Sequence, residues 1–245
     1  MKPVICKNYE EMSAYAAKEI AAAISAKPNF VLGLPTGSTP VGMYKELVAM
    51  NKSGKVDFSA VTTFNLDEYY PIKRDNSQSY YTFMYENLFS HININHDNVN
   101  IPNGEAEDPD AEGAAYDAKI KACGGVDLQI LGSGVNGHIG FNEPDSSLVL
   151  GTHKTSLTQN TIEVNSRFFN DISEVPTHAL TMGIKTIFDA KRIIILLNGD
   201  NKAHVLDTMF SGTITTACPA SLLALHANVT VVTDEATASK TKIFG

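Results

Sequence analysis

The side chains best suited to proton transfer lie in one glycine-rich stretch, residues 134–143, GVNGHIGFNE. His138 carries an imidazole, a group that can move a proton in either direction, and Glu143 on the same loop can orient it or couple to its charge. A Gly-rich turn with a capping histidine is the alternative, but the pairing of His138 with Glu143 favours a functional site. A simple turn needs one glycine, whereas the nine residues 132–140 hold four: Gly132, Gly134, Gly137 and Gly140.

A second proton-transfer group is Asp67, which directly follows the apolar run Val61–Leu66. A carboxylate at the mouth of a dry pocket, with no metal-ligand cluster nearby, suits a general base. Glu68 should point elsewhere, since successive side chains of a strand alternate. A serine nucleophile is not expected, because the sequence lacks the GxSxG elbow.

An anion site is predicted where a short loop follows the apolar run Phe30–Leu34 and enters a helix. Free backbone N–H groups and the helix dipole favour an anion there, and hydroxyl groups add donors. The loop lacks the Walker A lysine and the GxGxxG pattern, and a plain helix cap with Thr39 as N-cap and Pro40 at the first helical position is the alternative. Its residues are Thr36, Gly37, Ser38 and Thr39.

Two basic residues are candidate partners for the same anion. Lys202 begins an expected helix, where a cation opposes the helix dipole unless an anion is bound. Arg167 lies in a long polar segment and can hold a phosphate bidentately. Taken alone, each is as readily explained as a solvated surface charge.

Composition excludes several classes of function. The 245-residue chain has 27 acidic and 19 basic residues, a net charge of −8, which argues against nucleic acid or an anionic membrane as the main partner. Its three cysteines show no CxxC spacing, so neither a zinc site nor a disulfide framework is expected. We expect no metal and no cofactor. No signal peptide or membrane-length apolar run is recognisable, which predicts a cytoplasmic protein.

The elements that must position these groups alternate between strand and helix. The expected strands are Phe30–Leu34, Val61–Leu66, Val126–Leu131, Arg192–Leu197 and Val229–Val232. The expected helices are Tyr9–Ala26 with Asn8 as cap, Val41–Met50, Gln78–Phe89, Asp110–Cys123, a turn near Ile184–Ala190, Asn201–Phe210 and Pro219–Leu225. This order predicts one α/β domain over residues 1–245, a modified doubly wound, mostly parallel sheet with helices on both faces.

In such a sheet, ligands bind beyond the carboxyl ends of the strands. Four polar loops follow strands here, so we expect them to converge at one edge: Thr36–Thr39, Asp67-Glu68, Asn136–Glu143 and Asn198–Lys202. The polar segment Leu148–Pro176 has no clear period and is long for a connection, which favours an active-site lid over about residues 148–176. The fold places the site but does not identify its chemistry.

Five motifs occur together in an order that resembles the glucosamine-6-phosphate deaminase family, over nearly the whole chain. They are LGLPTGSTP (32–40), FNLDEYY (64–70), SYYTFM (79–84), GVNGHIGFNEP (134–144) and NSRFF (165–169). The resemblance implies a Rossmann-like fold and conversion of glucosamine 6-phosphate and water into fructose 6-phosphate and ammonia in amino-sugar catabolism.

The resemblance also implies residue roles. Asp67 would carry a proton between C2 and C1 of the sugar through an enolamine, and His138 with Glu143 would open the pyranose ring. Asn136 occupies a catalytic position where some members have an aspartate, so any charge support for His138 must come from Glu143. Phosphate contacts fall on the Thr36–Thr39 loop, Arg167 and Lys202.

Allosteric control is not expected. Some members bind an N-acetyl sugar phosphate through basic residues at positions that match His153 and Thr155 here, although Ser146 and Ser147 match the pattern. The sequence also ends at Gly245 without the longer tail of those members. Monomer and homo-oligomer both remain open.

Two alternative functions remain. A 6-phosphogluconolactonase shares the fold type but hydrolyses an ester and needs no enolising base such as Asp67. A sugar-phosphate-sensing module of a transcriptional regulator would bind without turnover, and neither the length nor the charge favours an attached DNA-binding domain.

Overall fold

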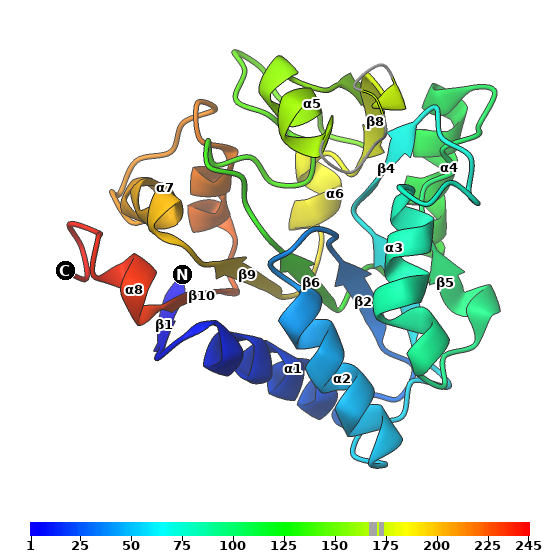
Figure 1. Ribbon diagram of the computed structural model, residues 1–245, viewed down its shortest axis with the longest axis horizontal. Helices are drawn as coiled ribbons and strands as arrows, with labels where there is room; N and C mark the ends of the chain where they lie inside the picture. Colours follow the sequence, from blue (N-terminus) through cyan, green and yellow to red (C-terminus); the bar gives the residue numbers. More distant parts are fainter. Residues whose placement is uncertain (167–170, 172–173) are drawn as a thin grey trace.

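The computed structural model describes residues 1–166, 171 and 174–245. Figure 1 shows a central sheet flanked by helices, with a smaller sheet beside it. The central strands are β1 (Lys2–Cys6), β2 (Val31–Leu34), β3 (Thr62–Asn65), β5 (Val99–Asn100), β6 (Leu128–Leu131), β9 (Ile193–Leu197) and β10 (Val229–Asp234). The smaller sheet contains β4 (Asp67–Tyr70), β7 (His153–Ser156) and β8 (His178–Thr181).

Along the chain, helices mostly alternate with these strands. The α-helices are α1 (Tyr9–Ala26), α2 (Val41–Lys52), α3 (Tyr80–Asn87), α4 (Pro109–Ala122), α5 (Gln159–Ser166), α6 (Ile184–Phe188), α7 (Ala203–Met209) and α8 (Glu235–Ala238). Short 3-10 helices cover Phe89–His91, His96–Asn98, Asp200–Lys202 and Pro219–Leu225.

The seven central strands run parallel in the order β1-β10-β9-β6-β2-β3-β5. Successive residues of a strand enter two separate hydrophobic clusters: Leu32 and Leu34 pack with α1, α2 and α3, whereas Val31 packs with α4, α6 and α7. Both faces of the sheet are therefore covered, as a parallel sheet requires. The predicted α/β architecture is confirmed.

The strand order also explains how the polar loops meet. β9, β6, β2 and β3 are consecutive neighbours in the sheet, and each is followed by one of the four polar loops. Because these strands are parallel, their carboxyl ends share one edge of the sheet. The prediction that the four loops start from one edge of the sheet is therefore confirmed.

The smaller sheet was not predicted. Asp67 does not simply end a strand, because it begins β4, which pairs with β8 in antiparallel register. Leu66 joins the two sheets: its N–H donates to the carbonyl of Leu34 at 3.1 Å, and its carbonyl accepts the N–H of Met182 at 2.8 Å. Asp67 is therefore fixed where the two sheets meet.

Several element assignments need correction. Thr39 is not an N-cap, because Pro40 occupies the cap position of α2 and no side chain caps the helix. The segment Leu148–Pro176 is not without regular structure, since it contains β7 and α5. β1 lies at the sheet edge, where half-exposed residues gave no buried-strand signal. Pro219–Leu225 is a 3-10 helix, and the helices predicted over Gln78–Phe89 and Asn201–Phe210 are shorter than expected.

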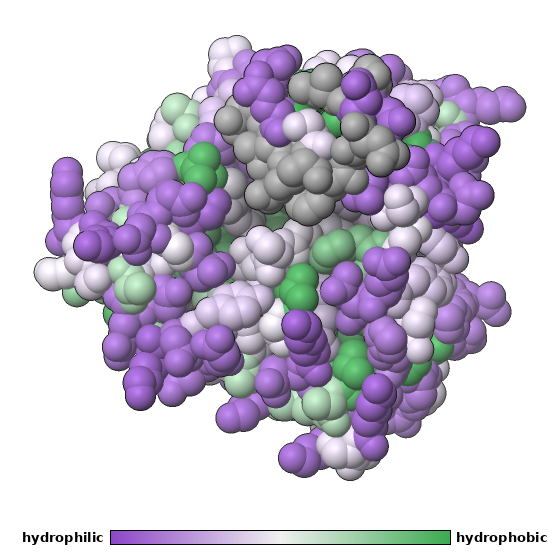
Figure 2. Space-filling model, viewed as in Figure 1, coloured by the Kyte–Doolittle hydropathy of each residue, from purple (hydrophilic) through white to green (hydrophobic). Residues whose placement is uncertain are grey.

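The surface is mainly polar. Figure 2 shows hydrophilic side chains over much of one face, with hydrophobic residues in small separate patches. Among the helices of the described part of the chain, none is both long and apolar enough to cross a membrane.

Candidate active site

Asp67 lies buried at the carboxyl edge of the central sheet, with 6% of its surface exposed. Burial, and secondly the negative charge of Glu68, raise the pKa of Asp67 to about 8. A carboxyl group that titrates near neutral pH can both accept and return a proton at working pH. The environment of Asp67 therefore suits a general acid–base group.

Glu68 is also buried, and its side chain points into backbone N–H groups. Its Oε1 accepts the N–H groups of Tyr69 and Tyr80 at 2.8 Å each, and its Oε2 accepts that of Tyr81 at 2.9 Å. Burial raises the pKa of Glu68 to about 7, whereas these N–H donors and Arg74 favour its ionised form. Glu68 thus binds the first turn of α3.

His138, Glu143 and Asn136 form one connected group. The Nδ1 atom of His138 lies 3.0 Å from Oε1 of Glu143, and Oε2 of Glu143 accepts a hydrogen bond from the Asn136 amide at 2.5 Å. The Thr161 hydroxyl of α5 donates to Glu143 at 3.2 Å. Burial alone would raise the pKa of Glu143, but hydrogen bonds from His138, Asn136 and Thr161 lower it. Glu143 is therefore a charged group that orients the histidine.

Two glycines are required by the packing of this loop. A Cβ atom on Gly134 would lie 2.2 Å from Cε1 of His138, so only glycine leaves the imidazole in its place. Gly137 has φ +83°, and a Cβ atom there would lie 2.3 Å from Sγ of the buried Cys218. The loop glycines thus leave room for the His138 ring and for Cys218 as well as turning the chain.

The loop of His138 packs against the strand pair that holds Asp67. Asn142 donates to the carbonyl of Met182, directly after β8, at 2.8 Å. A Cβ atom on Gly140 would lie 2.8 Å from Oγ1 of Thr181 and 3.7 Å from Oδ2 of Asp67. The structure therefore brings the Asp67 carboxyl group up to the loop that carries His138. Neither Asn142 nor Thr181 was predicted to have this role, because their contacts span 40 residues of sequence.

The predicted anion loop is held from two helices. The Tyr9 hydroxyl of α1 donates to the carbonyls of Ser38 and Thr39, at 3.2 and 3.0 Å, and accepts the N–H of Gly42. The Tyr44 hydroxyl of α2 donates to the carbonyl before the loop. These bonds use carbonyl groups, and within the described part of the chain no group accepts a hydrogen bond from the N–H groups of residues 36–39.

The loop turns at Gly37. Gly37 adopts φ +94°, a value that L side chains rarely adopt, and a Cβ atom there would meet no other group. Gly37 and Ser38 are exposed, and Thr36 and Thr39 are half-buried. The Thr36 side chain also hydrogen-bonds the Tyr80 hydroxyl of α3.

Lys202 lies at the N-terminus of α7, in the loop after β9. It is half-buried, forms no ion pair with any carboxylate in the described ranges, and burial lowers its pKa. A half-buried cation without a counter-ion is costly unless an anion binds it. The other basic candidate, Arg167, lies outside the described residues.

The positions compared with an effector site lie on β7. His153 and Thr155 are half-buried, and Nδ1 of His153 lies 2.9 Å from the Gly151 carbonyl. Lys154 lies over the ring of Tyr70 on β4, 5.8 Å from its centre. Lys154 therefore already has a partner in the smaller sheet.

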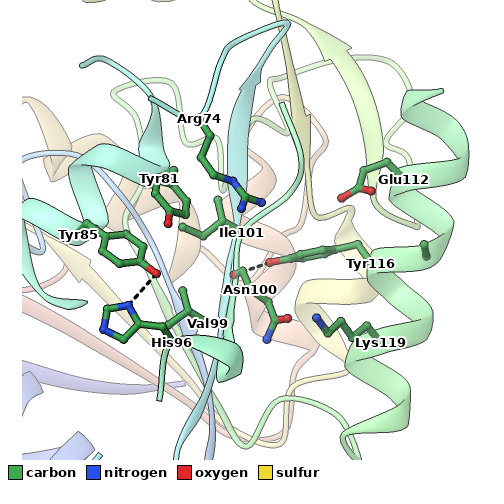
Figure 3. A pocket seen from close by; sticks show the side chains of 11 residues that line it. Arg74, Tyr81, Tyr85, His96, Val99, Asn100, Ile101, Glu112, Tyr116 and Lys119 are labelled. Carbon is green, nitrogen blue, oxygen red and sulfur yellow. Dashed lines mark hydrogen bonds between the residues drawn. The ribbon is translucent and has the colours of Figure 1, made fainter. Parts of the chain in front are cut away.

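A separate cavity of about 430 Å³ lies between α3 and α4, beside β5 (Figure 3). Arg74, Tyr81 and Tyr116 contribute to its walls, and the predicted site residues that the structure describes do not. The Tyr116 hydroxyl donates to the carbonyls of Asn65 and Asn100, at 2.8 and 3.1 Å. Tyr116 thereby fixes the carboxyl end of β3, two residues before Asp67.

Proton-transfer groups gathered at the carboxyl edge of a parallel sheet are typical of Rossmann-like α/β proteins that act on small molecules. Within the described ranges, no group of three or more His, Cys, Asp or Glu residues is arranged to hold a metal ion. The chain belongs to a particular family of this class, because residues 7–232 match the family of glucosamine-6-phosphate isomerases and 6-phosphogluconolactonases.

Relatives within the family extend over nearly the whole chain. A glucosamine-6-phosphate deaminase of Thermoanaerobacter pseudethanolicus is 53% identical over 239 residues, which cover 98% of this chain and 94% of the relative. One of Clostridium perfringens is 53% identical over 235 residues, covering 96% of this chain and 97% of the relative.

Solved structures show the same fold. A structure described as a monomeric glucosamine-6-phosphate deaminase superposes with a TM-score of 0.94 at 43% identity, over 98% of this chain and all of its own. A 6-phosphogluconolactonase from Trypanosoma cruzi reaches a TM-score of 0.77 at 21% identity, over 98% of this chain and 97% of its own. The second similarity shows the fold alone.

Proposed function

We propose that the protein is an isomerising glucosamine-6-phosphate deaminase, which converts glucosamine 6-phosphate and water into fructose 6-phosphate and ammonia in amino-sugar catabolism. The observation that carries this proposal is the presence of two separate proton-transfer centres at one sheet edge: buried Asp67, and His138 paired with Glu143. Hydrolysis of a lactone needs no group that moves a proton between carbons. Full-length relatives named as deaminases support the same choice.

In the proposed mechanism, the His138–Glu143 pair opens the ring. His138 transfers the proton of the O1 hydroxyl group to O5 as the C1–O5 bond breaks, and Glu143 stabilises the imidazolium that forms in between. Asn136 holds the second oxygen of Glu143 and so fixes its orientation. A neutral amide can fill this position because Glu143 already supplies the negative charge.

Asp67 acts on the open chain. Its carboxylate takes the proton from C2 while the ammonium group at C2 gives a proton to O1, so that an enolamine forms. The same carboxyl group then returns its proton to C1, which leaves an iminium at C2. Water then adds to C2 and ammonia departs, giving the ketone of fructose 6-phosphate. A buried carboxyl group whose pKa is raised to about 8 is a strong enough base for the first transfer and is returned unchanged by the second.

We assign the phosphate group of the substrate to the loop after β2 and to the loop after β9. The N–H groups of the Thr36–Thr39 loop and the ammonium group of Lys202 would supply donors, and we add Arg167 from the sequence. The segment 148–176, which includes β7 and α5, is proposed as a lid, because Thr161 on α5 contacts Glu143. The substrate is a phosphorylated metabolite, so we also propose that the enzyme works in the cytoplasm.

To test the proposal, purified protein is incubated with glucosamine 6-phosphate, and the amounts of ammonia and fructose 6-phosphate formed are measured. Equal amounts of the two products are expected. Hydrolysis of 6-phosphogluconolactone is measured with the same preparation and should be negligible. Lactone hydrolysis without ammonia would assign the lactonase function instead, and binding of the sugar phosphate without turnover would point to a sensing module.

A further inference from the structure

Glu68 is a buried carboxyl group beside the proposed base, and the proposed reaction gives it no role. Only 2% of its surface is exposed. A structural cap of α3 could be supplied by Ser79 alone, whose hydroxyl already accepts the N–H of Thr82 at 3.0 Å. Capping by Ser79 does not explain why a buried carboxylate, that of Glu68, also lies at this helix end.

We propose that Glu68 is a positioning residue that acts through Asp67: its negative charge strengthens Asp67 as a base, and its hydrogen bonds fix the start of α3 against the anion loop. The proposal rests on the function assigned to Asp67 above. Glu68 itself does not touch the substrate, because all three of its described hydrogen bonds go to backbone N–H groups.

The electrostatic half of the proposal follows from which carboxyl group ionises first. Three N–H donors and nearby Arg74 stabilise the charged form of Glu68, whereas burial and Glu68 destabilise the charged form of Asp67. The first proton is therefore lost from Glu68, and its negative charge then makes Asp67 hold its own proton more tightly. Among the described residues, the charge of Asp67 also acts on the phenols of Tyr44, Tyr80 and Tyr116. The loop that approaches Asp67 carries His138 and Glu143, and β8, which pairs with β4, carries His178.

Those other groups do not replace Glu68. Burial raises the pKa values of Tyr44, Tyr80 and Tyr116 well above the ordinary value, so the three phenols are neutral at working pH. Among the described residues, Glu68 is the negative charge that raises the pKa of Asp67. Removing that charge should therefore change the pH dependence of the base.

The positioning half follows from the contacts of Tyr80. Its backbone N–H is held by Glu68, its hydroxyl bonds the side chain of Thr36 in the anion loop, and its ring stacks on Phe141 with an interplanar angle of 7°. Arg74, which faces Glu68, also lies over the Tyr81 ring, 4.9 Å from its centre (Figure 3). Glu68 thus connects the base to the phosphate-binding side of the site.

Two substitutions of Glu68 separate the effect of its charge from the effect of its hydrogen bonds to α3. Glu68→Gln keeps the length and an acceptor oxygen but removes the charge. Glu68→Asp keeps the charge but withdraws the carboxylate from the N–H groups of α3. The matched control is Glu105→Gln, because the exposed Glu105 also accepts a backbone N–H, that of Arg74 at 3.1 Å, without perturbing Asp67.

The experiment records kcat/KM and kcat for glucosamine 6-phosphate against pH, with circular dichroism to check folding. The acid limb is the low-pH part of this profile, where activity falls as Asp67 becomes protonated. In Glu68→Gln the acid limb should move to lower pH by at least about one unit, because loss of a neighbouring negative charge lowers the pKa of Asp67. The kcat at high pH should also fall, since a base of lower pKa is weaker. Glu68→Asp should keep the acid limb near that of the parent and raise KM, and Glu105→Gln should match the parent.

An acid limb that stays in place in folded Glu68→Gln would overturn the proposal. Failure of both Glu68 variants to fold would also overturn it, because the residue would then serve the fold and not the base. Asp67→Asn is measured in parallel. Full turnover by that variant would reject the function proposed for Asp67, whereas an inactive Asp67→Asn with an unshifted Glu68→Gln would reject only the role of Glu68.

Discussion

Replacement of Gly134 by alanine should disable the enzyme without unfolding it. The added Cβ atom would lie 2.2 Å from Cε1 of His138, whereas ordinary contact begins near 3.4 Å. The imidazole must therefore retreat by about 1.2 Å, and it can do so because it is the end of a side chain. Gly134 does not have a positive φ, so alanine introduces no backbone strain there.

The size of the effect follows from the contact that the ring would lose. Nδ1 of His138 lies 3.0 Å from Glu143, and a retreat of this size takes the pair out of hydrogen-bonding range. A misplacement of about 1 Å can cost ~10²-fold in rate. We expect kcat/KM to fall about 100-fold, which corresponds to about 2.7 kcal/mol of transition-state stabilisation. The extra methyl group should lower the free energy of unfolding by only about 1–3 kcal/mol.

The ammonia-release assay measures this effect, and thermal unfolding checks the fold. Gly132→Ala is the matched control: it lies two residues earlier in the same loop, its φ is not positive, and a Cβ atom there would meet nothing within 4 Å. The control should keep nearly full activity. If Gly134→Ala were as active as Gly132→Ala, the orientation of His138 by Glu143 would not matter for ring opening, and the mechanism would be wrong.

Three further predictions concern turnover, phosphate and regulation. Asp67→Asn should keep substrate binding but lose ~10²–10⁴-fold in turnover; near-normal deuterium exchange at C1 or C2 of the sugar would contradict this. Lys202→Ala should raise KM for glucosamine 6-phosphate, and lower kcat too if phosphate binding closes the lid; equal efficiency of the parent enzyme on unphosphorylated glucosamine would argue against a phosphate site. Saturation curves should be hyperbolic and unaffected by N-acetylglucosamine 6-phosphate, because His153 and Thr155 supply no permanent cation; a Hill coefficient well above one that the effector abolishes would show the reverse.

Much of the fold could be predicted because its signals are local. The strands β2, β6 and β9 are buried along their whole length, and apart from Gln129 in β6 their side chains are apolar, which is a signal that can be read locally. Asn8 caps α1 as predicted, accepting the N–H of Glu11. Strands of this kind, alternating with helices, determine a parallel sheet and therefore the edge at which polar loops gather.

The part of the fold that could not be predicted depends on pairing between segments that are distant in the sequence. β7 and β8 are short strands with polar or mixed sequences, and β4 follows β3 after one residue, so none has a local signature that separates it from a loop. The contacts of Glu68 could not be predicted for the same reason, since its partners on α3 lie 12 and 13 residues away. The prediction for Glu143 did not need such pairing, because its partner His138 lies on the same loop.

The position of Leu66 between the two sheets has a consequence for motion. Its N–H is bonded to β2 in the parallel sheet and its carbonyl to the residue after β8, so Leu66 as a whole is released only when both hydrogen bonds break. Backbone held in this way between core strands opens rarely. Asp67 is thus held in a fixed position, so if it is the base that we propose, the substrate must be brought to it by adjustments in the surrounding loops.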